Sequence, residues 1–202
     1  MREEGEIVSG QELRQEHTPD DFGHFFRSWI RNPLATGAFA PSGRSLSRLM
    51  ATGLAAGARV LELGAGTGTV TEAILANGVR AKDLYLVERN PQFVRILERR
   101  FPHCQVLPAD ALALQPQLQA GSFDFVVSGL PLVLFSPEKR LCLLRQAFAL
   151  LGPQGLMHQF TYAGRCPIDR DVRRVLQIDS VLLGIAALNL PPAFVYRLSR
   201  AS

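Results

Sequence analysis

The stretch Glu62-Leu63-Gly64-Ala65-Gly66-Thr67-Gly68 decides the fold. It follows the apolar run ARVLEL (58–63), which predicts a buried strand, and it opens a helical pattern that ends at Asn77-Gly78. Glycines allow positive φ and a close approach of the backbone to a ligand, and the helix N-terminus offers unpaired N–H groups. The spacing is GxGxG rather than the GxGxxG of dinucleotide-binding folds. Because a single GxG motif is usually only a tight turn, it needs support from residues elsewhere in the chain.

Acidic residues at the ends of the neighbouring predicted strands supply that support. Glu62 stands two residues before the first glycine, where a carboxylate can meet a cationic amino group. Glu88, followed by Arg89, ends the run DLYLVE (83–88), where it can bind both hydroxyls of a ribose, and Asp110-Ala111 follows CQVLP (104–108), within reach of an adenine amino group. S-adenosylmethionine (SAM) carries such an amino group and no pyrophosphate. Three acids in this order therefore predict a SAM site.

The rest of the chain continues the alternation of strands and helices. Further strands are predicted at 123–129, 155–162, 177–185 and 194–200, and helices from Pro41 to Gly53, from Asn90 to about Arg100, and from Ser136 to Gly152. Such alternation predicts a parallel α/β sheet with helices on both faces, and the closing pair of strands predicts an antiparallel last strand.

Composition narrows the class of protein. The chain has 202 residues, 47% of them hydrophobic and 20% charged, which excludes a disordered or collagen-like protein and predicts a single folded body. Three widely spaced cysteines without a CxxC pair, and four histidines without an HExxH pair, predict neither a disulfide framework nor a metal site. The N-terminus has no apolar signal-peptide core and no stretch is long enough to span a bilayer, so a cytoplasmic location is expected.

The net charge of +4 conceals a segregation along the chain. Residues 1–21 carry seven acidic and two basic side chains, whereas residues 22–61 carry five arginines and no acid. Within the basic stretch, apolar side chains recur at helical spacing and predict an amphipathic helix that ends before Pro33. They are Phe22, Phe25, Phe26, Trp29 and Ile30. The stripe either packs on the domain or, beside Arg27 and Arg31, meets an anionic membrane interface.

The glycine loop and its acids resemble the class I SAM-dependent methyltransferases over residues 55–200. The resemblance implies a seven-stranded Rossmann-like sheet of order 3-2-1-4-5-7-6 whose last strand is antiparallel. It also implies that the glycine loop lines the methionine and ribose, that Glu88 binds the ribose, and that Asp110 lies beside the adenine. Ser128 to Pro131 would then face the methyl group and its acceptor.

Four further runs resemble the bacterial phospholipid N-methyltransferases. They are FFRSWIRNPLATGAFAPSGRSLSRLMA (25–51), VVSGLPL (126–132), QFTY (159–162) and NLPPAFVYR (189–197). The resemblance implies methylation of phosphatidylethanolamine towards phosphatidylcholine by a peripheral protein on the inner face of the cell membrane. Leu132 and Ser128 replace the aromatic ring and amide that enzymes acting on nucleic-acid bases place here, so no nucleic-acid partner is expected, and no obligate protein partner is evident.

These predictions assign roles to individual residues, with several alternatives left open. Ser42-Gly43 binds the SAM carboxylate or merely caps a helix, Arg44 or Arg31 holds a lipid phosphate or is solvated, and Tyr162 orients the amine or is a core aromatic. The predicted cofactor residues are Ser42, Gly43, Glu62, Gly64, Gly66, Gly68, Glu88, Arg89, Asp110, Ala111 and Ser128. The predicted catalytic residues are Tyr162, Ser128 and Gly129, and those predicted to meet substrate or membrane are Phe25, Phe26, Trp29, Arg31, Arg44 and Leu130.

The predicted organisation is an N-terminal helical segment, residues 1–53, followed by a methyltransferase domain, residues 54–202. Two other functions remain open from the sequence. One is an RNA or protein N-methyltransferase on the same fold, and the other is a SAM-binding subunit without catalytic activity.

Overall fold

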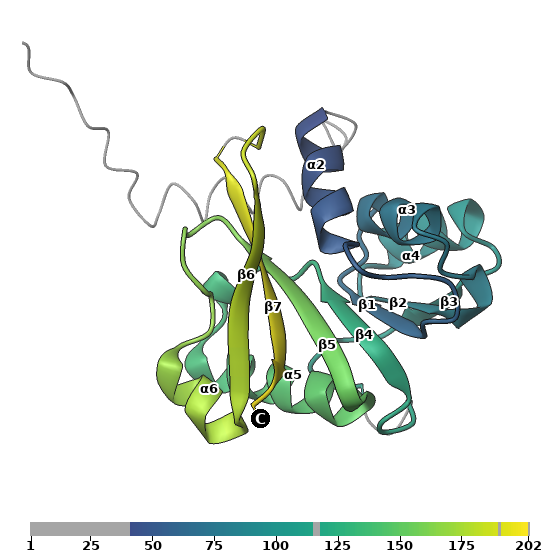
Figure 1. Ribbon diagram of the computed structural model, residues 1–202. Coiled ribbons are helices and arrows are strands. Elements are labelled where there is room, and N and C mark those ends of the chain that lie inside the picture. Colours follow the sequence, from purple (N-terminus) through teal and green to yellow (C-terminus); the bar gives the residue numbers. More distant parts are fainter. Residues whose placement is uncertain (1–40, 115–117, 190, 202) are drawn as a thin grey trace, which may run out of the picture. The chain divides into compact units, whose positions relative to one another are not determined.

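The computed structural model describes residues 41–114, 118–189 and 191–201, which contain a seven-stranded sheet of order β3-β2-β1-β4-β5-β7-β6 (Figure 1). The strands are β1 (Val60–Leu63), β2 (Leu84–Glu88), β3 (Gln105–Pro108), β4 (Phe123–Ser128), β5 (Leu151–Thr161), β6 (Ile178–Ala186) and β7 (Ala193–Arg200). Strands β1 to β5 pair in parallel, whereas β7 is antiparallel to both of its neighbours. The predicted strand order and antiparallel last strand are confirmed.

Helices connect these strands, and two of them begin with a side-chain cap. The helices are α2 (Pro41–Met50), α3 (Thr69–Ala76), α4 (Pro91–Arg100), α5 (Pro137–Leu150) and α6 (Arg170–Leu176), with short 3₁₀ turns η1 (Ala81–Asp83) and η2 (Leu132–Leu134). The Asn90 side chain accepts a hydrogen bond from Gln92 N at 2.9 Å, and Ser136 Oγ accepts one from Lys139 N at 3.4 Å. Both caps precede a proline in the first helical turn, as the sequence predicts.

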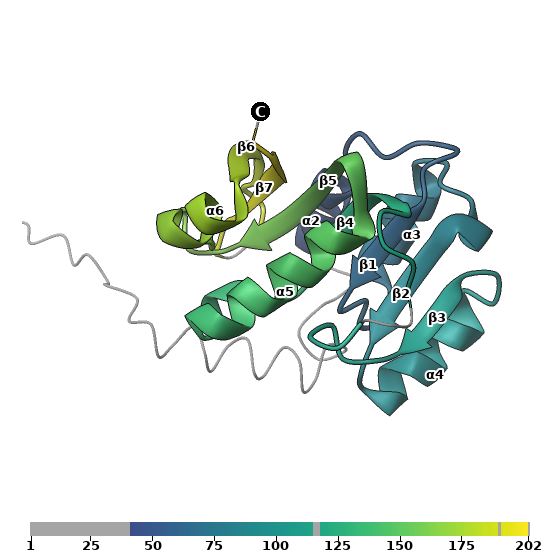
Figure 2. The same ribbon diagram turned by 90° about the horizontal axis from the view of Figure 1, so that it is seen from below.

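Strand alternation divides the helices between the two faces of the sheet. Leu61 and Leu63 of β1 belong to the buried cluster that includes Leu143 and Leu144 of α5, so one face packs against α5 (Figure 2). Glu62, between them, points to the other face, where Thr71 of α3 donates a hydrogen bond to it. Because β1 pairs in parallel with both β2 and β4, the carboxyl ends of these three strands lie at a common edge, where ligands of such sheets bind.

Two elements differ from the sequence prediction. The short helix α6 was not predicted, because its seven residues RDVRRVL carry no side-chain cap and no apolar stripe of normal length. Strand β5 begins at Leu151, where the sequence predicted a strand only from residue 155, and a register shift between Phe123 and Phe125 accommodates this early pairing with β4.

Helix α2 is held against the sheet at its carboxyl end. The buried ring of His158 contacts the Met50 carbonyl through Nδ1 at 2.8 Å, and the Asn77 side chain donates to the Ala51 carbonyl at 2.5 Å. Burial lowers the pKa of His158, which keeps the imidazole neutral near pH 7. A Cβ atom on Gly184 of β6 would lie 2.9 Å from Leu49, so glycine allows α2 to approach this strand. The boundary between residues 53 and 54 stays a prediction.

Candidate cofactor and acceptor site

The glycine loop leaves β1 in a conformation that requires glycine. Gly64, Gly66 and Gly68 all have positive φ, at 72°, 58° and 87°. The Val87 carbonyl of β2 accepts hydrogen bonds from Gly64 N at 2.9 Å and from Ala65 N at 3.2 Å, which fixes the loop to the neighbouring strand. Because a non-glycine residue is strained at such φ values, this spacing of glycines specifies the loop.

The three glycines differ in what lies next to them. A Cβ atom on Gly64 would lie 2.6 Å from Leu130 Cδ2, and one on Gly68 would overlap the Phe101 ring. A Cβ atom on Gly66 would meet nothing within 4 Å. Gly64 and Gly68 therefore allow close packing within the protein, whereas Gly66 borders open space that a ligand can occupy.

Glu88 holds the glycine loop through its carboxylate. Oε2 accepts a hydrogen bond from Gly66 N at 3.0 Å, and Oε1 accepts one from Asn90 N at 2.8 Å. Each carboxylate oxygen can accept a second bond, so both can still receive a hydroxyl group from a ribose. The predicted cofactor acid is thus also a support of the loop.

Glu62 lies beneath the loop and is almost fully buried. Thr71 Oγ1 donates a 2.7 Å hydrogen bond to Glu62 Oε2, which joins β1 to α3. The pKa of Glu62 is raised from its usual 4.5 to about 8, chiefly by burial; the hydrogen bond from Thr71 opposes this shift and the charge of Glu88 adds to it. The carboxyl group is therefore mainly protonated at pH 7 in the unliganded protein, and a cationic amino group nearby would favour its ionised form.

Asp110 follows β3 at the same edge of the sheet and remains half-exposed. Its Oδ1 accepts a hydrogen bond from Leu112 N at 2.9 Å, and its Oδ2 lies 3.6 Å from Nη1 of the exposed Arg89. Ala111 next to it is buried in the core. The predicted adenine and ribose acids thus end adjacent strands, with Arg89 joining the two segments.

The segment after β4 meets the glycine loop directly. Gly129 N donates to the Leu63 carbonyl at 2.9 Å, and a Cβ atom on Gly129 would lie 3.0 Å from the Gly64 carbonyl oxygen. Ser128 is fully buried and its Oγ accepts a weak bond from Leu130 N at 3.4 Å. The structure brings Gly129 and Leu130 to the cofactor loop, whereas Ser128 lies beneath this segment.

Gln159 supports the same segment and was not predicted from the sequence. It is fully buried on β5, directly opposite Ser128 of β4, and its Nε2 donates to the carbonyls of Leu130 and Phe160, both at 2.8 Å. Its Oε1 is buried without a hydrogen-bond partner. A buried glutamine inside an apolar strand is a signal for such a role, but its partner is known only once the strand register is known.

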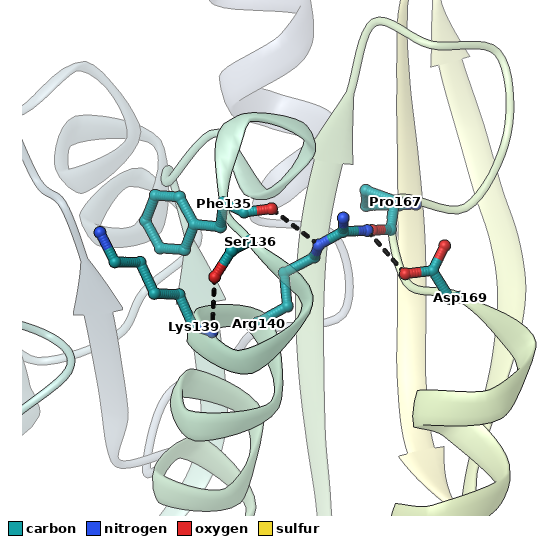
Figure 3. A network of polar contacts seen from close by, with 6 residues as sticks. All are labelled: Phe135, Ser136, Lys139, Arg140, Pro167 and Asp169. Atoms are coloured by element: carbon teal, nitrogen blue, oxygen red, sulfur yellow. Dashed lines mark hydrogen bonds and ion pairs between the residues drawn. The ribbon is translucent and has the colours of Figure 1, made fainter.

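Arg140 is a second support that the sequence did not reveal (Figure 3). Its Nε donates to the Phe135 carbonyl at 3.1 Å, and its Nη1 donates to the Pro167 carbonyl at 3.3 Å and to Asp169 at 2.8 Å. It therefore joins the segment that follows β4 to the segment that follows β5. Arg100 acts similarly on the cofactor side, where it hydrogen-bonds the Thr67 carbonyl.

Tyr162 follows β5 and lies partly buried against Phe160, with ring centroids 5.4 Å apart. Burial raises the pKa of its phenol, and a hydrogen bond with the Asn189 side chain opposes the shift. A phenol is neutral at physiological pH even at its usual pKa, and the upward shift keeps it so, which suits hydrogen bonding and not proton abstraction.

Some of the predicted site residues lie outside the residues that the structure describes. Phe25, Phe26, Trp29 and Arg31 lie outside the described residues, as does the side chain of Ser42. Gly43 and Arg44 belong to the first turns of α2, where the Gly43 carbonyl accepts a 2.8 Å bond from Ser47 Oγ and Arg44 is exposed. No helix within 41–114, 118–189 and 191–201 has the length and hydropathy to cross a membrane.

All three cysteines are free thiols. In the part of the chain that the structure describes, no group of three or more histidine, cysteine, aspartate or glutamate side chains could hold a metal ion.

Known proteins match both the sequence and this arrangement. A family profile described as a methyltransferase domain matches residues 60–155. An ornithine lipid N-methyltransferase from Singulisphaera acidiphila is 34% identical over 184 residues, which cover 87% of this chain and 94% of that protein.

Solved structures share the fold at lower identity. A 1,6-didemethyltoxoflavin-N1-methyltransferase from Burkholderia thailandensis, with bound S-adenosylhomocysteine, matches at a TM-score of 0.66 and 17% identity over 96% of this chain and 94% of that one. Phosphoethanolamine N-methyltransferase 1 from Haemonchus contortus, also with S-adenosylhomocysteine, matches at 0.60 and 14% identity over 90% of this chain and 49% of that one. The predicted cofactor is therefore confirmed. The chain is a SAM-dependent methyltransferase of class I and belongs to the same family as the ornithine lipid N-methyltransferase of Singulisphaera acidiphila.

Proposed function

We propose that this methyltransferase transfers the methyl group of SAM to the primary amine of a membrane lipid, with phosphatidylethanolamine as the acceptor. The observation that carries the lipid class is the similarity to a lipid N-methyltransferase along 87% of the chain. Phosphatidylethanolamine is the acceptor that the sequence runs at 126–132, 159–162 and 189–197 indicate by resemblance.

The chemistry of the acceptor segment fits an amine. Residues 128–132 read Ser-Gly-Leu-Pro-Leu and contain no titratable side chain, and the phenol of Tyr162, whose pKa burial raises above its usual value, is neutral. An amine needs only to lose its proton before it attacks, and a low-dielectric surrounding beside a sulfonium cation favours the neutral amine. The nitrogen lone pair then forms the N–CH₃ bond while the S–CH₃ bond breaks, which leaves the neutral thioether S-adenosylhomocysteine.

Ornithine lipid is the second candidate acceptor, because the similar protein from Singulisphaera acidiphila is named for it. Both lipids combine an amine, an anionic group and two acyl chains. Arg44, exposed on α2 in an acid-free helix, is our candidate for the anionic group of either headgroup.

Membrane contact by the predicted amphipathic stretch around Phe25, Phe26 and Trp29 is part of the same proposal. Substitution of these three residues by polar ones should abolish flotation of the protein with liposomes, and unchanged flotation would remove that part of the proposal.

The deciding experiment incubates purified protein and labelled SAM with phosphatidylethanolamine liposomes, with ornithine lipid micelles, and with RNA, and resolves the products by mass. Methylated phosphatidylethanolamine supports the proposal, and methylation of ornithine lipid alone assigns the second acceptor. Methyl transfer to RNA without transfer to lipid, or SAM binding without any turnover, would refute a lipid methyltransferase.

A further inference from the structure

The β6–β7 hairpin exposes apolar side chains at its tip and along its outer strand. Val181, Leu182 and Ile185 of β6 are 52%, 45% and 51% exposed, and Leu188 in the turn is 72% exposed. Only two other large hydrophobic side chains are exposed in the described part of the chain, Leu134 and Val175. A cluster of this kind on one hairpin marks an interaction surface.

The sheet topology places this tip at the edge that binds the cofactor. Strand β5 is parallel to β4, and β7 returns antiparallel to β5, with Phe194 opposite Thr161. Strand β6 is antiparallel to β7, with Ile185 also opposite Phe194. The carboxyl ends of β4, β5 and β6 therefore lie at the same edge of the sheet, and the C-terminus lies at the other end of the hairpin (Figure 1).

The surroundings of the hairpin tip are basic, and the one acid on β6 and β7, Asp179, lies near the start of β6, at the other end of the hairpin. Helix α2 packs against β6 and carries the exposed Arg44 and Arg48 on one helical face. Val181 lies directly opposite Arg197 of β7. Neither residues 41–61 nor residues 180–201 contain an aspartate or glutamate, and the fold brings these two separate acid-free segments together.

The short helix α6 lies beside the beginning of β6, away from the hairpin tip (Figure 1). It has seven residues, and Arg173 Nη1 donates a 2.8 Å hydrogen bond to Ser180 Oγ near the start of β6. Strand β6 is the edge of the sheet, so its outer backbone groups are not paired with another described strand.

We propose that the tip of the β6–β7 hairpin, together with the arginines of α2, is a docking surface for an anionic lipid bilayer. Apolar side chains flanked by arginines, without acids, suit such an interface. Docking there turns the carboxyl edge of the sheet, with the glycine loop and the segment after β4, toward the membrane. The inference rests on the proposed function for its lipid partner, and it names a second contact besides the N-terminal stretch.

The test measures binding of the full-length protein to vesicles that contain no amine lipid, so that it does not depend on methyl transfer. Phosphatidylcholine vesicles with and without phosphatidylglycerol are sedimented with wild type, with the double variant Ile185→Glu/Leu188→Glu, and with Leu188→Glu alone. The matched control is Val175→Glu. Val175 is also an exposed apolar side chain, at 63%, but it lies on α6, which directly precedes β6 and so lies at the end of that strand opposite to the hairpin tip.

We expect at least about tenfold weaker vesicle binding for the double variant, a smaller loss for Leu188→Glu, and wild-type binding for Val175→Glu. Arg44→Gln/Arg48→Gln should lose about fivefold per arginine on phosphatidylglycerol vesicles and little on phosphatidylcholine alone. SAM affinity measured on the same samples verifies that each variant is folded.

Vesicle binding equal to wild type in the double variant overturns the proposal, whichever alternative explains it. A fall in thermal stability with unchanged binding would show that the chain covers this face itself. Conversion of a wild-type dimer to a monomer with unchanged binding would show that a second copy covers it. Failure of wild type to methylate lipid would refute the proposed function and would leave this result standing, because the vesicles contain no acceptor.

Discussion

The carboxyl edge of the sheet has two halves that are held in place differently. We call the loop after β1 and the end of β2 the cofactor half, and the segment after β4 the acceptor half. On the cofactor half, the loop after β1 is held mainly by the adjacent strand β2, through backbone hydrogen bonds to Val87 and the carboxylate of Glu88, and Arg100 of α4 adds a contact to the Thr67 carbonyl. On the acceptor half, the segment after β4 is held by two side chains, Gln159 on β5 and Arg140 on α5, and Arg140 ties it in turn to Asp169, which follows β5. A cofactor that does not vary needs a fixed local motif, whereas an acceptor site is assembled from scattered side chains. We therefore expect the choice of acceptor to be decided on the second half.

Removal of Glu88 should have the largest effect, because it breaks the cofactor half at its centre. Glu88→Ala leaves Gly66 N and Asn90 N without an acceptor and removes the predicted ribose contact. Two hydrogen bonds to a charged group correspond to about 3 kcal/mol, so SAM affinity should fall by about a hundredfold in calorimetric titration. Glu98→Ala, an exposed acid on α4, is the control. Wild-type affinity in Glu88→Ala would mean that this carboxylate neither shapes the loop nor meets the cofactor.

Gly66→Ala separates the ligand contact from backbone strain. Gly66 and Gly53 both have positive φ, at 58° and 78°, and a Cβ atom at either meets nothing within 4 Å. Alanine at each position should lower the free energy of unfolding by about 1–2 kcal/mol. Only Gly66→Ala should also weaken SAM binding, by at least about tenfold, because the cofactor is expected against that residue. Equal SAM affinities in the two variants would place the cofactor away from Gly66.

Arg140→Ala tests whether the acceptor half can be perturbed without an effect on SAM binding. The substitution removes the hydrogen bonds by which Arg140 links Phe135 to Pro167 and Asp169. We therefore expect kcat/KM for the acceptor to fall by about fivefold to tenfold, while SAM affinity stays at the wild-type value. Steady-state kinetics with each substrate varied in turn make the measurement, and Arg145→Ala, exposed on the same helix, is the control. A parallel loss of SAM affinity would show that the two halves are coupled.

Glu62→Gln should have the smallest effect, measured as the free energy of unfolding of the unliganded protein at neutral pH. The native carboxyl group is mainly protonated there, and glutamine can still accept a hydrogen bond from Thr71. The unfolded chain releases this proton near 4.5 and the folded chain only near 8. The folded state therefore binds more protons in this range, and its stability falls as pH rises from about 4.5 to about 8. Denaturant unfolding at several pH values should show that wild type loses stability relative to Glu62→Gln over that range. Parallel profiles would contradict a raised pKa.

The difference between the halves also decides what the sequence could predict. The glycine loop, Glu88 and Asp110 each lie at the end of a strand or within two residues of it, so a single strand identifies the place of each. Gln159 could not be assigned a partner, because its bond to Leu130 depends on which residue of β4 lies opposite it. Arg140 reaches Asp169 at the start of α6, a helix too short and too polar for the sequence pattern to reveal. Ser128 was predicted to face the acceptor, and the pattern could not show that its side chain is buried beneath the segment.

The position of β7 has a consequence for the order in which the strands pair during folding. Strand β7 is the last strand in the chain, yet it lies between β5 and β6 and is the only described partner of β6. Residues 178–186 therefore join the sheet only through β7, either after β7 has paired with β5 or together with β7 as a hairpin. The two strands are neighbours in the sequence, so their pairing is local, whereas the pairing of β7 with β5 joins residues farther apart in the chain and completes the sheet.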